Sequence, residues 1–401
     1  MQKNKIKAIF YAYSNNALDH LAPYAVLCKI KKIESTIVFG EDFIRQKVRP
    51  KTNILKILKD YKIEIYNIPK FKNKGFMNYL FFIIWNITKF VDEKNFLTSY
   101  LSSKLKGLCN KLYNHLDGEN LGKTAAKNLI KKSKHIIVFT DEWNTKKQIQ
   151  NSFLLYFKKK FKIISTGHAV WHANNEIKKN ELTETEDIAL LSNKWELERK
   201  KLVPRREVIG SVRFSKKWLS ILDQYSDDKV IKNNNKINVS VLTHSEKHTS
   251  SWKRMFNLLN EISKRKDIAL NIVPHIRGMS NLKPPESLKK NWNNKSSLDT
   301  IIKNSDLVLF WESSAVFEAV VRNKKILYLS FLSVRDQKYL WQKKANPDII
   351  IKNEHQLFKT LDNYKKNIVI DNSSFKEIIW PKGDPWSNAT DFLKSIINFK
   401  S

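Results

Sequence analysis

"SDLVLFWESSAVFEAVVRNKKILYL", residues 305–329, contains an apolar run, an acidic and hydroxyl cluster, a helix-like pattern and a second apolar run. Two continuous apolar runs joined by a helix are typical of parallel α/β units, because the strands of such units are buried on both faces. Residues 306–311 and 325–330 are therefore predicted to be strands. Glu312, Ser313 and Ser314 then follow the carboxyl end of the first strand, where a helix begins.

The same alternation runs through the whole chain. Further apolar runs rich in Ile, Val, Phe and Tyr lie at residues 6–13, 35–39, 62–67, 135–140, 161–166, 207–209, 237–243 and 268–274. Helix-length stretches separate most of them, so the pattern predicts an α/β fold with doubly wound parallel sheets. The 401 residues exceed what one hydrophobic core usually serves, which favours two domains.

The domain boundaries are predicted from breaks in the pattern. The polar, Asn-rich segment 223–236 separates two sets of strands of comparable size. We therefore expect an N-terminal domain over 1–225 and a C-terminal domain over 236–375. Pro and Gly residues then precede an amphipathic pattern at about 387–399, so residues 376–401 are predicted to form a helix that packs back on the N-terminal domain.

The composition indicates a partner that carries negative charge. Lys and Arg number 73 and Asp and Glu 39, which gives a formal net charge of +34. Such an excess attracts nucleic acid, anionic lipid and phosphorylated substrates alike. The lysines are spread along the whole chain, which argues against a nucleic-acid binder. Cys28 and Cys109 lie in apolar or basic helix-like stretches, so we expect two reduced core residues in a cytoplasmic protein.

Residues 76–90, "FMNYLFFIIWNITKF", lie in a predicted helical insertion at about 70–116. The stretch is shorter than the roughly 20 residues that a spanning helix needs. Its aromatic residues and flanking lysines are typical of a helix at a membrane interface, and a buried core helix is the alternative. The apolar run at 6–13 is too short for a signal peptide and is expected to be the first strand.

Polar side chains follow several predicted strands of the C-terminal half. Ser313 and Ser314 at a helix N-terminus would bind the phosphate of an activated donor, unless one of them is simply the N-cap. Glu318, one turn further, would reach ribose hydroxyls or lie in solvent. The candidate donor-binding residues are Arg213, Thr243, His275, Arg277, Glu312, Ser313, Ser314 and Glu318.

Titratable residues also follow strands of the N-terminal half. Asp19 and His20 come after the first strand, Asp141 and Glu142 after 135–140, and His168 after 161–166. Clusters at strand ends in both halves predict a cleft between the domains that carries chemistry. One of these five residues would be the general base. Asp141 or Glu142 is preferred for a sugar acceptor and His168 for phosphoryl transfer.

Four segments carry a resemblance to a known group of proteins. "STGHAVWH", "VIGSVRFS", "NIVPHIRG" and the opening stretch, in this order, resemble bacterial GT-B enzymes of surface polysaccharide synthesis. The opening stretch is similar to a block of capsule Kdo transferases, and CDP-glycerol glycerophosphotransferases have similar segments. Ile276 and Val212 stand where those families usually have proline.

The resemblance implies two Rossmann-like domains that face a cleft. It also implies Ser313 and Ser314 on the donor phosphate, Glu318 on the ribose and His275 on the leaving phosphate. The expected function is transfer of a sugar, from a CMP-sugar by preference, to a capsule, lipopolysaccharide or similar lipid-linked glycan. No metal and no cofactor are expected, and the enzyme is expected peripherally on the cytoplasmic face of the inner membrane. A CDP-glycerol-type polyol-phosphate transferase and a non-enzymatic nucleic-acid binder are the alternatives.

Overall fold

The computed structural model describes residues 6–40, 43, 52–68, 119–131, 133, 135–143, 147–167, 186–226, 232–244, 249–274, 284–293, 296–334, 346–364 and 373–398. The predicted insertion at about 70–116 and Cys109 lie outside the described residues. Three predicted site residues, His168, His275 and Arg277, lie outside them as well.

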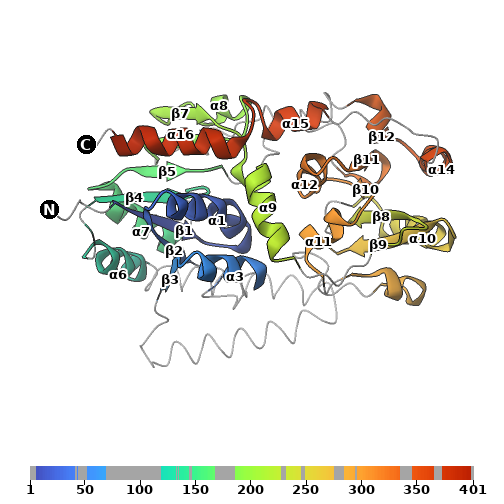
Figure 1. The fold of residues 1–401 in the computed structure, drawn as a ribbon, viewed down its shortest axis with the longest axis horizontal. Coiled ribbons are helices and arrows are strands. Elements are labelled where there is room, and N and C mark those ends of the chain that lie inside the picture. The colour runs from blue at the N-terminus through green and yellow to red at the C-terminus, as the bar shows by residue number, and fades with distance from the viewer. Residues whose placement is uncertain are drawn as a thin grey trace, which may run out of the picture. The chain divides into compact units, whose positions relative to one another are not determined.

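Two parallel sheets with accompanying helices make up the described part of the fold (Figure 1). The first sheet has the order β3-β2-β1-β4-β5-β6-β7. Its strands are β1 Ile6–Ala12, β2 Glu34–Phe39, β3 Glu64–Asn67, β4 His135–Thr140, β5 Ile163–Ser165, β6 Ile188–Leu191 and β7 Arg205–Val208. The second sheet has the order β12-β11-β10-β8-β9. Its strands are β8 Ile237–Leu242, β9 Ile268–Val273, β10 Leu307–Phe310, β11 Lys325–Leu329 and β12 Ile350–Ile351.

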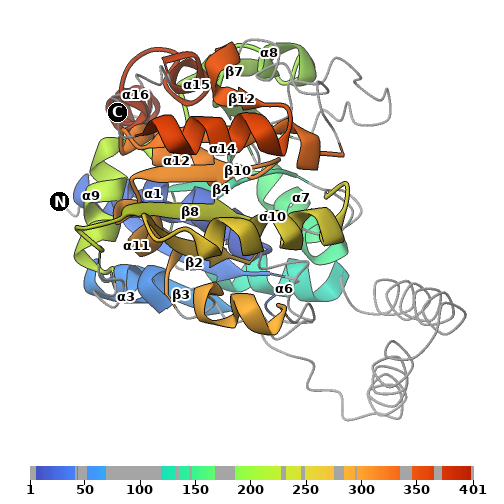
Figure 2. The same cartoon turned by 90° about the vertical axis from the view of Figure 1, so that its right-hand side faces the viewer.

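Helices connect and cover these strands. The α-helices are α1 Asn15–Ile30, α3 Thr52–Asp60, α6 Glu119–Ile130, α7 Gln148–Lys158, α8 Glu196–Arg199, α9 Lys216–Gln224, α10 Trp252–Lys264, α11 Leu298–Lys303, α12 Val316–Val321, α14 Glu354–Asn363, α15 Ser373–Ile379 and α16 Pro385–Asn398. Short 3-10 helices are η3 Val212–Phe214, η5 Glu286–Asn291, η6 Ser330–Leu332 and η7 Pro347–Ile349. In the second sheet, α10 lies near the edge strand β9 and α14 near the opposite edge strand β12 (Figures 1 and 2).

The chain divides into two compact units. The first holds β1 to β5 with α1, α3, α6 and α7, and the second holds α8, η3, α9 and the elements from β8 to α16. Strands β6 and β7 are divided between the two. The predicted domain boundaries stay a prediction.

Burial explains why the central strands read as continuous apolar runs. Strands β8 and β10 are buried at every residue, and β1 pairs in parallel with β2 and β4 and is buried from Lys7 to Ala12. Edge strands differ, since β9 alternates buried and partly exposed residues. At β3, an edge strand of the first sheet, Glu64 accepts hydrogen bonds from Lys7 Nζ at 3.0 Å and Thr36 Oγ1 at 2.7 Å. The predicted α/β class with two parallel sheets is confirmed.

Strands β6 and β12 were missed by the sequence pattern. Strand β6 has four residues, Ile188–Leu191, and β12 has only Ile350–Ile351. Runs this short are common in helices and loops as well, so they predict a strand only weakly. A neighbouring strand supplies the pairing of each, because β5 pairs with β6 and the longer β11 pairs with β12.

The C-terminal segment packs on residues that follow β7. Asn388 Nδ2 of α16 donates to the Ile209 carbonyl at 3.0 Å, and Trp380 Nε1 donates to the Phe214 carbonyl at 3.0 Å. Gly210 makes this approach possible, because a Cβ there would lie 2.7 Å from the Ile379 carbonyl oxygen and its φ is +87°. The segment "VIGSVRFS" thus contains a tight turn at Gly210.

Across the described ranges, no helix has the length and apolar character needed to cross a membrane.

Candidate functional site

The candidate site lies at the carboxyl edge of the second sheet. Strands β8, β10 and β11 run parallel, so their carboxyl ends meet at one edge. Thr243 follows β8 and Glu312 follows β10, while Ser333 comes shortly after β11. Ligands of doubly wound sheets bind at this edge, which makes it the first place to look for a site.

Hydrogen bonds join the segments that follow these three strands. Trp311 Nε1 donates to Thr249 Oγ1 at 3.1 Å, and Ser333 Oγ donates to Glu312 Oε1 at 2.5 Å. Thr249 and Ser333 also form an antiparallel backbone bridge. All four residues are buried, so the three strand ends form one connected structure, which we call the strand-end rim.

Glu312 adopts an unusual backbone conformation in this rim. Its φ is +51°, in the left-handed region that residues other than glycine rarely enter. For an L-residue with a Cβ this conformation costs roughly 1–2 kcal/mol, and surrounding contacts must hold it. The bond from Ser333 is one such contact. Strained residues of this kind cluster at binding and catalytic sites.

Ser313 and Ser314 form the turn that leads into α12. Their carbonyls accept hydrogen bonds from the amides of Val316 and Phe317, each at 3.2 Å. The helix N-cap is Ala315, without a side-chain cap, so the alternative that one of the two serines caps the helix is wrong. In the described part of the chain neither serine hydroxyl makes a hydrogen bond. Both hydroxyls are therefore available to a ligand.

Helix α12, which follows the turn at Ser313 and Ser314, carries part of a buried ion cluster. Arg322 Nε donates to Glu318 Oε1 at 3.0 Å, and Arg322 also binds Asp223 of α9, with 2.7 Å between its guanidinium and the carboxylate. Burial, with a contribution from Asp299, raises the pKa of Glu318 to about 7, although the charges of Arg322 and Arg213 act in the opposite direction. The Glu318 carboxylate thus shares its environment with two arginines.

Packing brings Arg213 toward α12. Phe214, its neighbour in η3, lies with its ring centroid 5.8 Å from that of Phe317. The η3 turn that carries Arg213 therefore packs on α12 in the same unit, and the charge of Arg213 acts on Glu318 of that helix.

Two of the predicted donor residues are already engaged inside the protein. Glu318 is 6% exposed and bonded to Arg322, so the alternative of a solvated helix residue is wrong, and its contact with ribose stays a prediction. Thr243 is buried, and its hydroxyl donates to the Val273 carbonyl at 2.9 Å. That bond ties the ends of β8 and β9 together.

The predicted titratable residues of the first unit differ in how far they are buried. Ser14 caps α1 by accepting a bond from the Ala17 amide at 3.2 Å, so Asp19 and His20 fall inside α1, where both are buried. Asp141 follows β4 and is 0% exposed, whereas Glu142 is partly exposed. Glu142 is therefore the more accessible of the two carboxylates after β4.

Sequence reasoning missed several residues of the rim and the cluster. Arg322 carries a local signal, since it follows Glu318 by four residues, the spacing of helical ion pairs. Thr249, Ser333 and Asp223 carry none, because each meets its partner from a distant segment. Among the described residues no group of three or more His, Cys, Asp or Glu side chains is arranged to hold a metal ion.

Comparison with known proteins shows the fold. No family model and no curated protein matches the chain. A putative UDP-N-acetylglucosamine 2-epimerase from Listeria monocytogenes superposes with a TM-score of 0.55 at 14% identity, covering 98% of this chain and 96% of that one. UDP-GlcNAc 2-epimerase from Neisseria meningitidis, bound to UDP-GlcNAc, superposes with a TM-score of 0.55 at 12% identity, covering 99% of this chain and 100% of that one. A glycosyltransferase from Rickettsia africae has a TM-score of 0.50 at 14% identity, covering 98% of both chains.

The chain has a GT-B fold. This confirms the fold class that the sequence resemblance implied, with two Rossmann-like parts that are each built on a parallel sheet. Identities of 12–14% show the fold alone, and these structures do not single out the capsule Kdo transferases or the CDP-glycerol enzymes.

Proposed function

We propose that the chain is a glycosyltransferase that takes a sugar from a nucleotide-activated donor, by preference a CMP-sugar, and adds it to a bacterial surface glycan. The observation that carries this proposal is the strand-end rim of the second unit. There the hydroxyls of Ser313 and Ser314 make no hydrogen bond in the described part of the chain, and the η3 turn that carries Arg213 packs on the helix that follows them. Hydroxyl donors and an arginine carried by neighbouring elements are groups that bind phosphate.

The roles of the donor-binding residues follow from their charge. Ser313 and Ser314 would donate to the phosphate, and Arg213 would offset the charge that develops as the nucleotide leaves. A carboxylate repels phosphate but accepts from hydroxyl groups, so Glu312 and Glu318 belong on the ribose side. His275 and Arg277 follow β9 in the chain and are proposed to neutralise the leaving phosphate. Transfer of this kind needs no metal ion when such groups stabilise the leaving group.

The general base is proposed among the carboxylates after β4. Of the two, Glu142 has the greater access to solvent, which supports it over the buried Asp141. A base must lie within hydrogen-bond reach of the acceptor hydroxyl, and its loss typically slows turnover by about 10²–10⁴-fold. His168 is the candidate if the group transferred is a phosphoryl group.

The acceptor is proposed to be a lipid-linked glycan of the capsule or lipopolysaccharide type, reached from the cytoplasmic face of the inner membrane. The sequence resemblance to capsule Kdo transferases supports the acceptor class. The formal net charge of +34 supports binding of the enzyme to an anionic membrane surface.

A polyol-phosphate transferase is the second candidate. The observation in its favour is the segment from Gly210 to Arg213, which resembles that of CDP-glycerol enzymes and in which Gly210 has a φ of +87°. Both candidates would use a cytidine nucleotide.

A thermal-shift panel of CMP, CDP, UDP, UMP and GDP on the full chain tests the proposal. A ligand bound by the native state alone raises the melting temperature by mass action, and we expect the cytidine nucleotides to do so most strongly. The double variant Ser313→Ala/Ser314→Ala should weaken binding by about 1–3 kcal/mol, the value for losing hydrogen bonds to a charged group.

A second Ser-Ser pair provides the matched control. Ser373 and Ser374 open α15 in the same unit, and replacing both with Ala should leave nucleotide affinity unchanged. The proposal fails if no nucleotide stabilises the protein, or if both double variants bind equally well. Salt-sensitive DNA binding without any nucleotide response would favour the nucleic-acid binder instead.

A further inference from the structure

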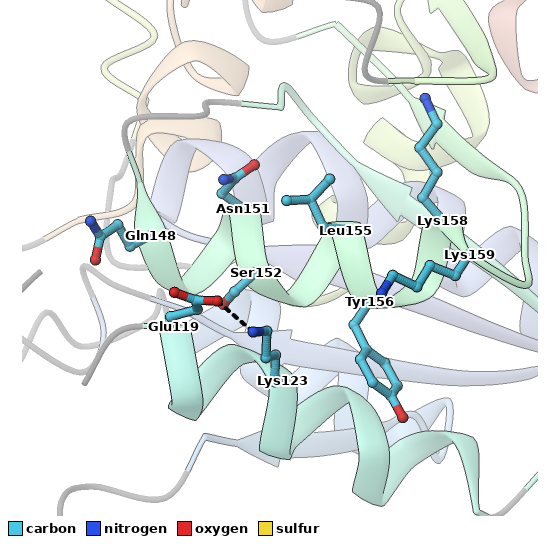
Figure 3. A pocket seen from close by; sticks show the side chains of 9 residues that line it. All are labelled: Glu119, Lys123, Gln148, Asn151, Ser152, Leu155, Tyr156, Lys158 and Lys159. Atoms are coloured by element: carbon cyan, nitrogen blue, oxygen red, sulfur yellow. Dashed lines mark hydrogen bonds and ion pairs between the residues drawn. The ribbon is translucent and has the colours of Figure 1, made fainter. Parts of the chain in front are cut away.

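A cavity of about 620 Å³ opens between α6 and α7 in the first unit (Figure 3). Its lining combines three lysines with apolar and small polar side chains, among them Lys123, Ser152, Leu155, Tyr156, Lys158 and Lys159. We call the surface that these two helices present around the cavity the α6–α7 face. The roles proposed above for the strand ends do not use this face.

The α6–α7 face carries a concentrated positive charge. Residues 147–162 include five lysines and no acidic residue. On α6 and directly after it, Lys123, Lys127 and Lys131 are exposed and spaced four residues apart, so they lie along one side of the helix. Among the cavity-lining side chains the acidic one is Glu119, and it is paired with Lys123. The face therefore favours an anionic partner.

An exposed leucine distinguishes this face from a purely electrostatic surface. Leu155 is 48% exposed in the middle of α7, between the helix N-terminus and the lysines at its end. Tyr156, the next residue in the chain, is partly buried and packs against the core. Apolar side chains surrounded by lysines are typical of helices that lie on an anionic bilayer, where the lysines meet headgroups and the apolar groups enter the acyl boundary. Contact with nucleic acid does not require an exposed leucine.

Helices α6 and α7 pack closely enough to form this face together. A Cβ on Gly122 of α6 would lie 2.3 Å from the Ile149 carbonyl oxygen of α7. The backbones therefore approach each other directly. In the chain, α6 also follows the helical insertion predicted at about 70–116, whose aromatic and basic residues are typical of a membrane interface.

We propose that the α6–α7 face binds the anionic phospholipid headgroups of a bilayer. The inference rests on the proposed function, in which the acceptor is lipid-linked, and it names the membrane contact of the first unit. Headgroup phosphates would occupy the cavity beside the three lysines, and Leu155 would contact the acyl boundary.

Cosedimentation of the full chain with vesicles tests this surface. One set contains equal parts of phosphatidylcholine and phosphatidylglycerol, and the other contains phosphatidylcholine alone. We expect binding to the anionic set only, weakened by salt, because the attraction decays within a Debye length. Replacing Lys123, Lys158 and Lys159 together with Gln should lower partitioning by on the order of 100-fold, about fivefold for each lysine. Leu155→Gln should reduce the binding that survives high salt.

A matched triple variant controls for net charge. Lys253, Lys264 and Lys266 are exposed residues of the second unit, and Lys264 is paired with Glu261 as Lys123 is with Glu119. Replacing these three with Gln changes the net charge equally and should leave vesicle binding within about twofold, since a specific face and not the overall field is responsible.

Three results would overturn the inference. They are equal loss in the two triple variants, unchanged binding in the α6–α7 variant, and absence of binding to anionic vesicles by the unmodified chain. Retention on single-stranded RNA that depends on the α6–α7 lysines, without vesicle binding, would assign the face to nucleic acid instead. Nucleotide thermal shifts on the same variants separate this outcome from a failure of the proposed function, because the α6–α7 substitutions leave the residues of the strand-end rim unchanged.

Discussion

Replacing Gly122 with Ala tests how closely α6 and α7 approach each other. The added Cβ would lie 2.0 Å from Ser152 Oγ, 2.3 Å from the Ile149 carbonyl oxygen and 2.9 Å from the Phe153 amide nitrogen. The Ser152 side chain can rotate away at the loss of its bond to the Ile149 carbonyl, which is 3.1 Å long. The other two atoms belong to the backbone of α7, so the helices themselves must separate.

The magnitude follows from two opposing effects. Alanine is favoured over glycine inside a helix by about 1 kcal/mol. Overpacking a well-packed contact costs typically about 1–3 kcal/mol, and two backbone contacts place this site at the upper end. We therefore expect a net loss of about 1–2 kcal/mol. For a unit of this size the loss corresponds to a fall in melting temperature of roughly 2–8 °C.

Thermal unfolding of three variants separates these effects. Gly122→Ala should melt below the unmodified chain, and adding Ser152→Ala should restore little stability, because the clash with the Ile149 carbonyl remains. Asn128→Ala, at an exposed position of the same helix, controls for propensity and should melt at the same temperature or slightly higher. A Gly122→Ala variant that melts as high as the Asn128→Ala control would show that the helices are not in backbone contact.

Three further predictions concern charged groups. Because burial holds the folded-state pKa of Glu318 near 7, above its ordinary value of 4.5, the native state keeps a proton that the unfolded state has lost between these pH values. Native stability should therefore fall as pH rises through this window, by about 3 kcal/mol at most, and urea unfolding of Glu318→Gln should lack that slope. Arg322→Met leaves the buried Glu318 carboxylate uncompensated and should cost about 3–5 kcal/mol in the same measurement, so an unaltered urea midpoint would contradict the buried pair. Asp141→Asn or Glu142→Gln should slow transfer by about 10²–10⁴-fold without changing nucleotide affinity. If neither does so and His168→Ala abolishes turnover, phosphoryl transfer is the better interpretation.

The local sequence pattern was sufficient to predict many of the strands of the second unit. The apolar runs at 306–311 and 325–330 became β10 and β11, because a strand buried on both faces must be apolar at consecutive positions. The placement of Ser313 and Ser314 at the end of β10 followed from the same pattern.

Tertiary structure alone decided which side chains meet. Ser333 reaches Glu312, and Asp223 reaches Arg322, from segments that are distant in the chain. No local signal predicts these pairs, because they depend on which strands lie next to each other in the sheet and how the following segments turn. The sequence also predicted a linker starting at residue 223, whereas Asp223 is part of α9 and is held there by its ion pair. Residue type and periodicity thus determined the strands and the candidate site, and the order of strands in the sheet determined the contacts that hold the site in place.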